Sequence, residues 1–405
     1  MDKCLICDSE YSPFVDFGLM PIANAFATKE QIKNEYTFPM KVGFCGNCNM
    51  VQLVEQPERE KMFHENYAFF SSTSNYMKEH FKLFANSVSE LQDLNEDSFV
   101  VEVGCNDGIL LKNFIINHIS CLGVEPSKNV AQVAMEKGIE VITQFFDRPL
   151  AERILQSHQK ADAILSANVM CHIPYMHSIF DGVKTLLKED GIFMFEDPYL
   201  GEIIEKTSFD QIYDEHVFLF SALSVNYLAN MHDLELVNVE PQITHGGSMR
   251  YTIAHKGIKK VSQNVVKLID QEKKLGLDKK QSYLGFTDNI NKIKNDLINL
   301  LTKLKNDGKK VVAYGATSKS TTVTNYFGIT PDLVGCIYDT TPIKQNKLSP
   351  GAHIPVLPYD QFRESEPDYV LLFAWNHATE IMKKESDYMA NNRHWITYIP
   401  NVKVI

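Results

Sequence analysis

Strand-type and helix-type hydrophobic patterns alternate through the middle of the chain. Four short apolar runs recur there: residues 99–103, 122–124, 163–166 and 192–196. Helix-type stretches separate them, as at residues 129–137 and 176–188. Strands that alternate with helices at this interval are typical of a parallel, doubly wound sheet. We therefore predict a Rossmann-like α/β domain over residues 66–256, entered through a helix-compatible segment at residues 67–94.

A second α/β pattern fills the last quarter of the chain. Apolar runs of strand type lie at residues 310–314, 334–338 and 369–373, and a glycine turn follows the first run. Before this pattern, apolar side chains recur at the spacing of one helix face: Ile293, Leu297, Leu300, Leu301 and Leu304. We predict helices that link two larger parts, followed by a second Rossmann-like α/β domain, together spanning residues 257–405.

Two cysteine pairs mark the beginning of the chain, Cys4 with Cys7 and Cys45 with Cys48. A gap of two residues lets both thiolates of a pair face one ion, and two such pairs complete a tetrahedral shell around zinc. Four thiolates leave no open position on the ion, so the site should be structural. With the short β-type runs nearby, the pairs predict a small zinc-binding domain over residues 1–65.

Composition and charge narrow the function further. The chain has 405 residues, enough for two or three domains, and a net charge of −11. This charge argues against a general nucleic-acid binder, which needs a basic surface. The sequence has neither an apolar run of membrane-spanning length nor a signal peptide, so we expect a cytoplasmic protein. Its oligomeric state stays open, and a monomer is compatible with the sequence.

The loop after the first predicted strand carries the pattern of a nucleotide site. Residues 102–108 read E-V-G-C-N-D-G, and Glu125 closes the next strand, where a carboxylate can accept ribose hydroxyls. These two features alone fit NAD equally well. The loop, however, lacks the G-x-G-x-x-G spacing, and the third strand leads into Asn168 and His172, as in a methyltransferase. We therefore predict a site for S-adenosylmethionine.

These residues resemble the sugar C-methyltransferases that act on nucleotide-linked keto-deoxysugars. The resemblance covers nearly the whole chain, including the four cysteines. Its motifs lie in order at residues 67–74, 102–108, 195–199, 213–216, 245–250, 314–319, 341–345, 350–356 and 375–376, with Asn168 and His172. One departure is that the family commonly shows Y-H-E-H where this chain has Tyr213-Asp214-Glu215-His216.

The resemblance implies S-adenosylmethionine as methyl donor, a structural zinc ion and a nucleotide-linked keto sugar as partner. It assigns His216 as the catalytic base, with Glu215, Tyr213 and Tyr67 beside it. The residues expected at the donor are Tyr67, Phe70, Ser72, Glu102, Gly104, Asn106, Asp107, Glu125 and Asn168. The residues expected at the sugar nucleotide are His172, Tyr199, His245, Lys319 and Lys344.

Methylation of carbon requires a carbanion equivalent, and a 4-keto sugar supplies one because its C-3 proton lies next to the carbonyl. A base must take this proton, and imidazole titrates near the working pH, which favours His216. Glu215 is the alternative base. Tyr67, Tyr213 and His172 are candidates, with Asn168, to hold the ketone oxygen and orient the sugar.

The second α/β domain is expected to bind the nucleotide. A strand, the Gly315 turn and a helix N-terminus form an anion site suited to a pyrophosphate, and Lys319 and Lys344 can add positive charge. The G-x-x-x-x-G-K spacing of a P-loop is absent, which argues against ATP hydrolysis.

Three readings remain open at this point. The first is C-methylation, at C-3, of a nucleotide-linked 4-keto-deoxysugar. The second is O- or N-methylation of a similar sugar. The third is a zinc-bearing binding protein that has lost catalysis. The sequence leaves the nucleotide (dTDP, GDP or CDP), the sugar and the stereochemistry undetermined.

Overall fold

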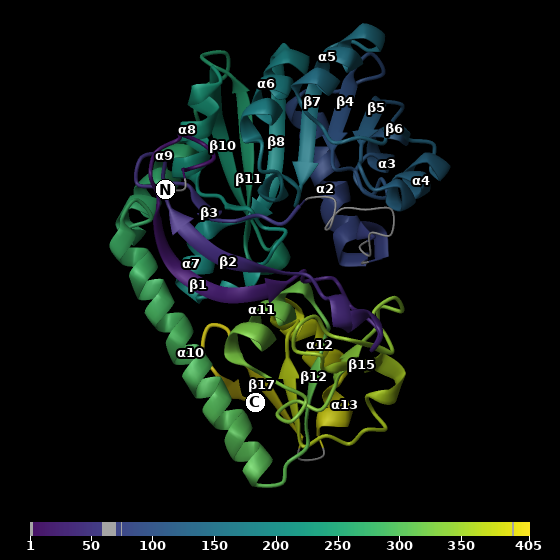
Figure 1. Cartoon of the computed structure of the whole chain (residues 1–405). Helices are drawn as coiled ribbons and strands as arrows, with labels where there is room; N and C mark the ends of the chain where they lie inside the picture. The colour runs from purple at the N-terminus through teal and green to yellow at the C-terminus, as the bar shows by residue number, and fades with distance from the viewer. Residues whose placement is uncertain (1–2, 59–69, 74, 391–392) are drawn as a thin grey trace.

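The computed structural model describes residues 3–58, 70–73, 75–390 and 393–405, which form three sheets arranged along one axis (Figure 1). The larger α/β unit lies at one end and the second α/β unit at the other, with a curved N-terminal sheet between them. Tyr67, predicted at the active site, lies outside the described residues. No helix of the described residues is long and apolar enough to cross a bilayer.

The N-terminal sheet is antiparallel and has the order β1-β2-β3-β9. Its first three strands are β1 (Ser12–Pro21), β2 (Thr37–Phe44) and β3 (Val51–Leu53). The fourth strand, β9 (Phe218–Leu219), comes from the middle of the chain and pairs with β3. The predicted division at residue 65 therefore does not separate this sheet from the rest of the chain.

The central sheet has the order β10-β11-β8-β7-β4-β5-β6. From one edge to the other, its strands are β10 (Leu234–Gln242), β11 (Ser248–His255), β8 (Leu187–Pro198), β7 (Ala161–Ala167), β4 (Phe99–Val103), β5 (Ser120–Val124) and β6 (Glu140–Ile142). The strands β8, β7, β4, β5 and β6 are parallel to one another, whereas β11 runs antiparallel to its neighbours β8 and β10. Every residue of β4 is buried, because a central parallel strand is covered on both faces.

The predicted parallel sheet is thus confirmed, and the antiparallel edge formed by β10 and β11 was missed. The helices of this unit, beginning with the one that precedes β4, are α2 (Asn75–Leu91), α3 (Lys112–Ile115), α4 (Lys128–Glu136), α5 (Arg148–Ser157), α6 (Met176–Leu186), α7 (Leu200–Lys206) and α8 (Ala222–Met231). The order of the chain reverses at β4, whose neighbours are β5 and β7. Ligands of open α/β sheets bind at such a switch point, beyond the carboxyl ends of the strands.

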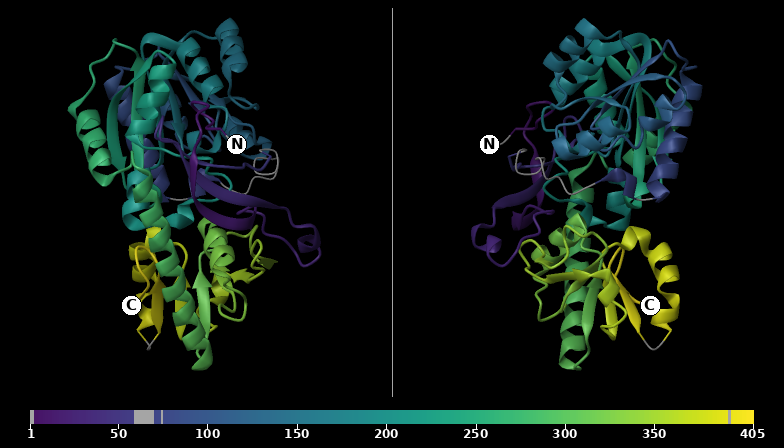
Figure 2. Two further views of the ribbon diagram at one scale, coloured as in Figure 1. Left: turned by 60° about the vertical axis from the view of Figure 1, so that its left-hand side comes forward. Right: turned by 90° about the vertical axis from the view of Figure 1, so that its right-hand side faces the viewer.

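Two helices, α9 (Gln263–Leu275) and α10 (Lys280–Asn306), lead to the second α/β unit. The long helix α10 runs along one side of the molecule, past β1 and down to the third sheet (Figures 1 and 2). Its buried stripe includes Ile293, Leu297, Leu301 and Leu304, as the spacing predicted, while Leu300 is half-buried. The helix therefore packs the N-terminal sheet and the third sheet into one hydrophobic core.

The third sheet has the order β14-β15-β13-β12-β16-β17-β18, with parallel pairing from β15 to β17. Its strands are β14 (Lys347–Leu348), β15 (Pro355–Pro358), β13 (Ile337–Asp339), β12 (Val311–Tyr314), β16 (Tyr369–Leu372), β17 (His394–Thr397) and β18 (Lys403–Val404). Its helices are α11 (Ser318–Phe327), α12 (Ala378–Lys384) and α13 (Ser386–Met389). The predicted second Rossmann-like domain is confirmed, with β13 beginning three residues later than expected.

A buried carboxylate joins α9 to the central unit. Glu272 is fully buried and accepts hydrogen bonds from the backbone N–H groups of Ala222 (2.7 Å) and Leu223 (2.8 Å), at the beginning of α8. The Tyr199 hydroxyl donates to the same carboxylate over 3.1 Å. Burial raises the pKa of Glu272 to about 7. Tyr199, which is expected at the sugar, thus makes its hydroxyl contact with a carboxylate of the core.

We predict that Glu272→Ala lowers the free energy of unfolding by about 2–4 kcal/mol, because it leaves buried donors without an acceptor. Urea unfolding followed by circular dichroism measures this change. The matched control is Asp270→Ala on the exposed side of the same helix, expected within about 0.5 kcal/mol of the wild type. Equal effects of the two substitutions would contradict the assignment.

Candidate functional site

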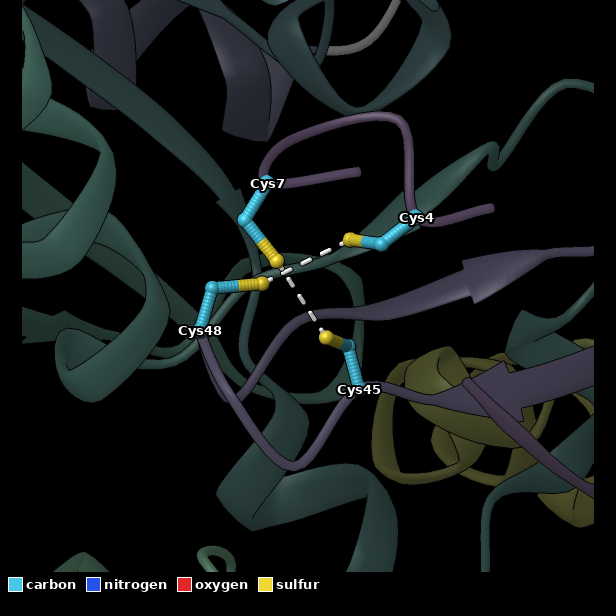
Figure 3. Close-up of side chains that lie close together, drawn as sticks. All are labelled: Cys4, Cys7, Cys45 and Cys48. Carbon is cyan, nitrogen blue, oxygen red and sulfur yellow. Dashed lines mark hydrogen bonds between the residues drawn. The ribbon is translucent and has the colours of Figure 1, made fainter. Parts of the chain in front are cut away.

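The four N-terminal cysteines point toward one centre (Figure 3). The Sγ atoms of Cys4 and Cys48 are 3.5 Å apart, as are those of Cys7 and Cys45, and all four sulfurs lie within 4.8 Å of one another. Sulfurs bound 2.3 Å from a tetrahedral zinc ion lie about 3.8 Å apart. The cluster therefore fits a closed four-thiolate zinc site, in which the ion would hold the two chain segments together.

A pocket lies at the carboxyl ends of β4, β5 and β7, at the switch point of the central sheet. It is lined by Ser71, Met77, Phe81, Val103, Gly104, Asn106, Val124, Glu125, Pro126, Phe145, Phe146, Ala167, Asn168, Val169, His172, Ile173, Pro174, Tyr175 and His245. Of the predicted donor residues, Gly104, Asn106, Glu125 and Asn168 are among them. The pocket is mostly apolar and includes a few polar groups, as small-molecule sites usually do.

The loop after β4 is held by Glu125 at the end of β5. One carboxylate oxygen accepts the Asn106 N–H (3.0 Å) and the other accepts the Ser127 N–H (2.8 Å). Gly104 has a φ of 73°, a left-handed conformation that glycine adopts without strain, and an added Cβ would lie 2.4 Å from Val169. Each oxygen of Glu125 keeps a further lone pair for ribose hydroxyls, although burial raises the pKa of this carboxyl.

Asn168 presents a second polar group to the pocket. Its backbone is left-handed, with a φ of 57°, and its N–H donates to the carbonyl of Glu196 over 2.6 Å. The side-chain oxygen is buried and has no hydrogen-bond partner among the described residues. An unsatisfied buried acceptor is costly unless a ligand donates to it. Together with Glu125, it makes the pocket fit a donor that carries hydroxyl and ammonium groups.

Of the other predicted donor residues, those that the structure describes are not among the residues that line the pocket: Phe70, Ser72, Glu102 and Asp107. Asp107 is buried and accepts hydrogen bonds from the N–H and the hydroxyl of Ser72, and Asn106 accepts the Ser71 N–H over 3.0 Å. These contacts hold the segment before α2 against the loop. Phe70 precedes this segment and is half-buried, while Glu102 is buried within β4.

His216 lies next to the pocket, in the segment between α7 and β9. Its ring stacks on that of His172, with centroids 5.3 Å apart, and packs against Tyr213 at 4.1 Å. His172 itself lines the donor pocket. Burial, helped by the nearby His172 charge, lowers the pKa of His216 well below its usual value. The structure thus brings together three of the predicted residues beside the donor site.

The neighbouring acids Asp214 and Glu215 face the N-terminal unit. Asp214 accepts the Ala23 N–H over 2.9 Å, and Glu215 accepts the side-chain amide of Asn24 over 2.8 Å. Asp214, which replaces the histidine common in the resembling family, is therefore used for packing between units. Burial raises the pKa of Glu215 above its usual range, and the Lys344 charge opposes this rise.

The second α/β unit repeats the loop arrangement of the first. The Gly315 N–H bonds to the carbonyl of Tyr338 (2.8 Å), as the Gly104 N–H bonds to that of Val124 (2.7 Å). Asp339 then accepts the Ala316 N–H over 2.6 Å and the Thr341 N–H over 2.7 Å, in the manner of Glu125. This correspondence links two parts of the chain in which the sequence showed no strong repeat.

The two predicted lysines of this unit have different hydrogen-bond partners. Lys319 approaches the carbonyl of His245, which lines the donor pocket, with an N–O distance of 3.4 Å. Lys344 donates to the carbonyl of Ala316 over 2.9 Å and lies near Glu215.

Sequence reasoning missed most of the apolar wall of the donor pocket. This wall includes Met77 and Phe81 of α2, and Phe145 and Phe146 after β6. The sequence offers a signal only for Phe145 and Phe146, which follow a short strand of the same sheet.

Comparisons with known proteins agree with this architecture. Three family models match the chain: "Putative zinc binding domain" over residues 4–63, "Methyltransferase domain" over residues 76–239 and "C-methyltransferase C-terminal domain" over residues 243–400. Together with the fold and the pocket, they define an S-adenosylmethionine-dependent methyltransferase with a zinc-binding domain. The C-methyltransferase NovU of Streptomyces niveus is 31% identical over 408 residues, covering 100% of this chain and 97% of its own. The chain belongs to this family of C-methyltransferases.

Solved structures that match part of the chain include the magnesium protoporphyrin IX methyltransferase of Synechocystis PCC 6803 with bound SAH. It is 13% identical, covers 44% of this chain and 83% of its own, and has a TM-score of 0.36. An S-adenosylmethionine-dependent methyltransferase of Clostridium acetobutylicum is 14% identical, with coverages of 46% and 94% and a TM-score of 0.34.

We predict that Cys45→Ser reduces the bound zinc measured by elemental analysis. It should also lower the melting temperature by about 10 °C or more, because zinc binding contributes directly to folding. Cys121→Ser, outside the cluster, is the control and should keep the wild-type zinc content. Full zinc occupancy in Cys45→Ser would exclude the four-thiolate site.

We also predict that Glu125→Ala weakens binding of S-adenosylhomocysteine by about 10–100-fold, since hydrogen bonds to a charged group contribute about 1.5–3 kcal/mol. Isothermal titration calorimetry measures this change. Glu140→Ala, at an exposed position of β6, should bind normally. Unchanged affinity in Glu125→Ala would place the donor elsewhere.

Proposed function

We propose that this C-methyltransferase methylates C-3 of a nucleotide-linked 4-keto-deoxysugar, with His216 as the base. The observation that carries the proposal is the buried imidazole of His216, which stacks on His172 beside the donor pocket. The resemblance of the sequence to sugar C-methyltransferases supports the substrate class.

The hydrogen bonds of His216 define its tautomer. Its Nδ1 lies 2.5 Å from the carbonyl oxygen of Gln211, and a carbonyl can only accept. Nδ1 therefore carries the hydrogen, which leaves the lone pair of a neutral ring on Nε2. An imidazole with an unprotonated Nε2 can take a proton from carbon.

The environment of His216 keeps the ring neutral. Burial and the charges of His172, His245 and Lys319 lower its pKa, so the basic form persists at pH values well below the usual pKa of 6.5. Proton removal next to a ketone then produces an enolate, whose negative charge compensates the imidazolium that forms. Tyr213 and His172 contact the base and are the candidates to orient the sugar.

S-adenosylmethionine supplies an electrophilic methyl group when it is bound. Glu125 and Asn168 would hold it, and Met77, Phe81 and Phe146 would keep water from the pocket. Methylation at carbon requires the ring carbon to reach this pocket from the side of His172 and His216. The base and the donor site thus share one wall.

The nucleotide is proposed to bind at the second α/β unit. The helix α11 begins after Thr317, whose side chain caps it by accepting the Ser320 N–H over 3.2 Å. A helix N-terminus favours phosphate, and Lys344 adds a positive charge next to the Gly315 loop. We expect the enzyme to meet such nucleotide sugars in the cytoplasm, as the sequence predicted.

We predict that His216→Asn lowers both methyl transfer and donor-independent exchange of the C-3 proton with deuterium oxide by at least about 100-fold. Donor binding, measured by calorimetry, should stay within about threefold of the wild type. In the wild type, the rate of exchange should stay level as the pH falls through 6.5, because the lowered pKa of His216 keeps the base unprotonated. If His216→Asn exchanged the C-3 proton at the wild-type rate, His216 would not be the base. If the enzyme methylated oxygen or nitrogen instead of carbon, the wild type would show no exchange.

A further inference from the structure

We propose that Lys319 is a catalytic residue that holds the oxygen of the enolate, rather than a contact to the pyrophosphate. This inference rests on the proposed function and deepens it. It assigns to the second α/β unit a direct part in the reaction at the sugar ring.

The position of Lys319 supports this role. Lys319 is the second residue of α11 and is only 8% exposed. Its ammonium group lies 3.4 Å from the carbonyl oxygen of His245 and 4.6 Å from the ring centroid of Trp375. Since His245 lines the donor pocket, Lys319 directs its charge from the second α/β unit toward the methyltransferase unit.

Lys319 also lies within electrostatic reach of the base. Its positive charge is among the causes that lower the pKa of His216 and of His245. A cation beside a base hinders the formation of imidazolium unless an anion forms at the same time. An enolate provides this anion, and it is stabilised most by a preorganised cation in a water-poor site.

Asp210 is placed to keep Lys319 charged. One of its oxygens accepts the indole N–H of Trp375 over 2.7 Å and the hydroxyl of Tyr398 over 2.6 Å, while the other is buried without a partner among the described residues. Burial lowers the pKa of Lys319 to about 8, and the charge of Asp210 opposes this shift. Lys319 is therefore mostly protonated near neutral pH, and Asp210 acts as its positioning residue.

Lys344 offers a comparison within the same unit. Its ammonium group bonds to the Ala316 carbonyl and lies 5.0 Å from the ring of Phe26, on the side of Glu215 and Asp339. It thus lies against the Gly315 loop, where the nucleotide is proposed. We therefore assign Lys319 to the reacting sugar ring and Lys344 to the phosphates of the nucleotide.

The proposed step is balanced as follows. The C-3 proton moves to Nε2 of His216, and the electrons of the C–H bond form a C=C bond while the carbonyl electrons move to oxygen. Lys319 donates a hydrogen bond to this oxygen and keeps its proton. The enolate carbon then bonds to the methyl group, the sulfur–methyl bond breaks toward sulfur, and the ketone re-forms. His216 later releases its proton to water.

The test compares Lys319→Met, Lys319→Arg and Lys344→Met in the full-length, zinc-loaded enzyme. The substrate is whichever of dTDP-, GDP- and CDP-4-keto-6-deoxyglucose the wild type uses best. The readouts are C-3 deuterium exchange without donor, the kcat and KM of methyl transfer, and calorimetric binding of the matching nucleoside diphosphate. Lys319→Met should lose at least about 100-fold in exchange and kcat, with nucleotide affinity within about threefold. Lys344→Met should weaken binding of the nucleoside diphosphate and raise the KM of methyl transfer.

A pH profile adds a readout that a purely structural role would not change. Wild-type exchange should fall as the pH rises through about 8, where Lys319 loses its proton. Asp210→Asn should move this fall to lower pH, because removing the carboxylate charge lowers the pKa of Lys319 further. Lys319→Arg should retain part of the exchange and show no fall in this range, since guanidinium stays charged.

The outcomes separate the inference from the function on which it rests. If the wild type exchanges the C-3 proton and Lys319→Met exchanges it equally fast, only the role of Lys319 is overturned. Loss of nucleotide affinity in Lys319→Met with normal exchange would assign the lysine to the phosphates. If Lys319→Met fails to fold, an unchanged profile in Asp210→Asn overturns the inference. Absence of wild-type exchange on every substrate would overturn both proposals.

Discussion

A buried chain segment must find partners for its polar groups, and the segment over residues 209–216 finds them in the N-terminal unit and in both α/β units. Asp210 accepts hydrogen bonds from Trp375 and Tyr398 of the second α/β unit, and the Ile212 carbonyl accepts the Thr322 hydroxyl of α11. Asp214 is bound by the backbone of Ala23 in the N-terminal unit. The Gln211 side chain donates to the carbonyl of His245 in the central unit. His216, the proposed base at the end of this segment, is thus positioned by contacts to all three units.

Through this arrangement, the zinc-binding domain also helps to position the residues next to His216. The four cysteines hold the beginning of the chain against β2 and β3, and β1 then leads to Ala23 and Asn24. Asn24 donates to Glu215 and accepts the Ser318 hydroxyl of α11 over 3.1 Å. The side-chain amide of Asn24 therefore connects Glu215, which precedes the proposed base, with the N-terminus of α11, where the nucleotide is proposed to bind. Loss of zinc would loosen this link as well as the local fold.

Much of the architecture could be predicted from the sequence, because apolar runs and cysteine spacing are local signals. The strand β4 matched its predicted bounds, and the cysteine pairs met as expected. The pairing of β9 with β3 could not be predicted, since it joins residues far apart through a two-residue strand. The hydrogen bond from the Tyr199 hydroxyl to Glu272 could not be predicted either, because no local pattern indicates it. The apolar donor wall likewise depends on which loops the fold brings together.

The central claim is that the donor methyl group is transferred to the carbon next to a ketone. The most direct test is to incubate the enzyme with nucleotide-linked 4-keto-6-deoxysugars and a donor carrying a trideuterated methyl group, and to locate the label by NMR. The account predicts a trideuteromethyl group bonded to C-3, with loss of the original C-3 proton. Label on an oxygen or nitrogen atom, or no transfer to any keto sugar, would contradict it.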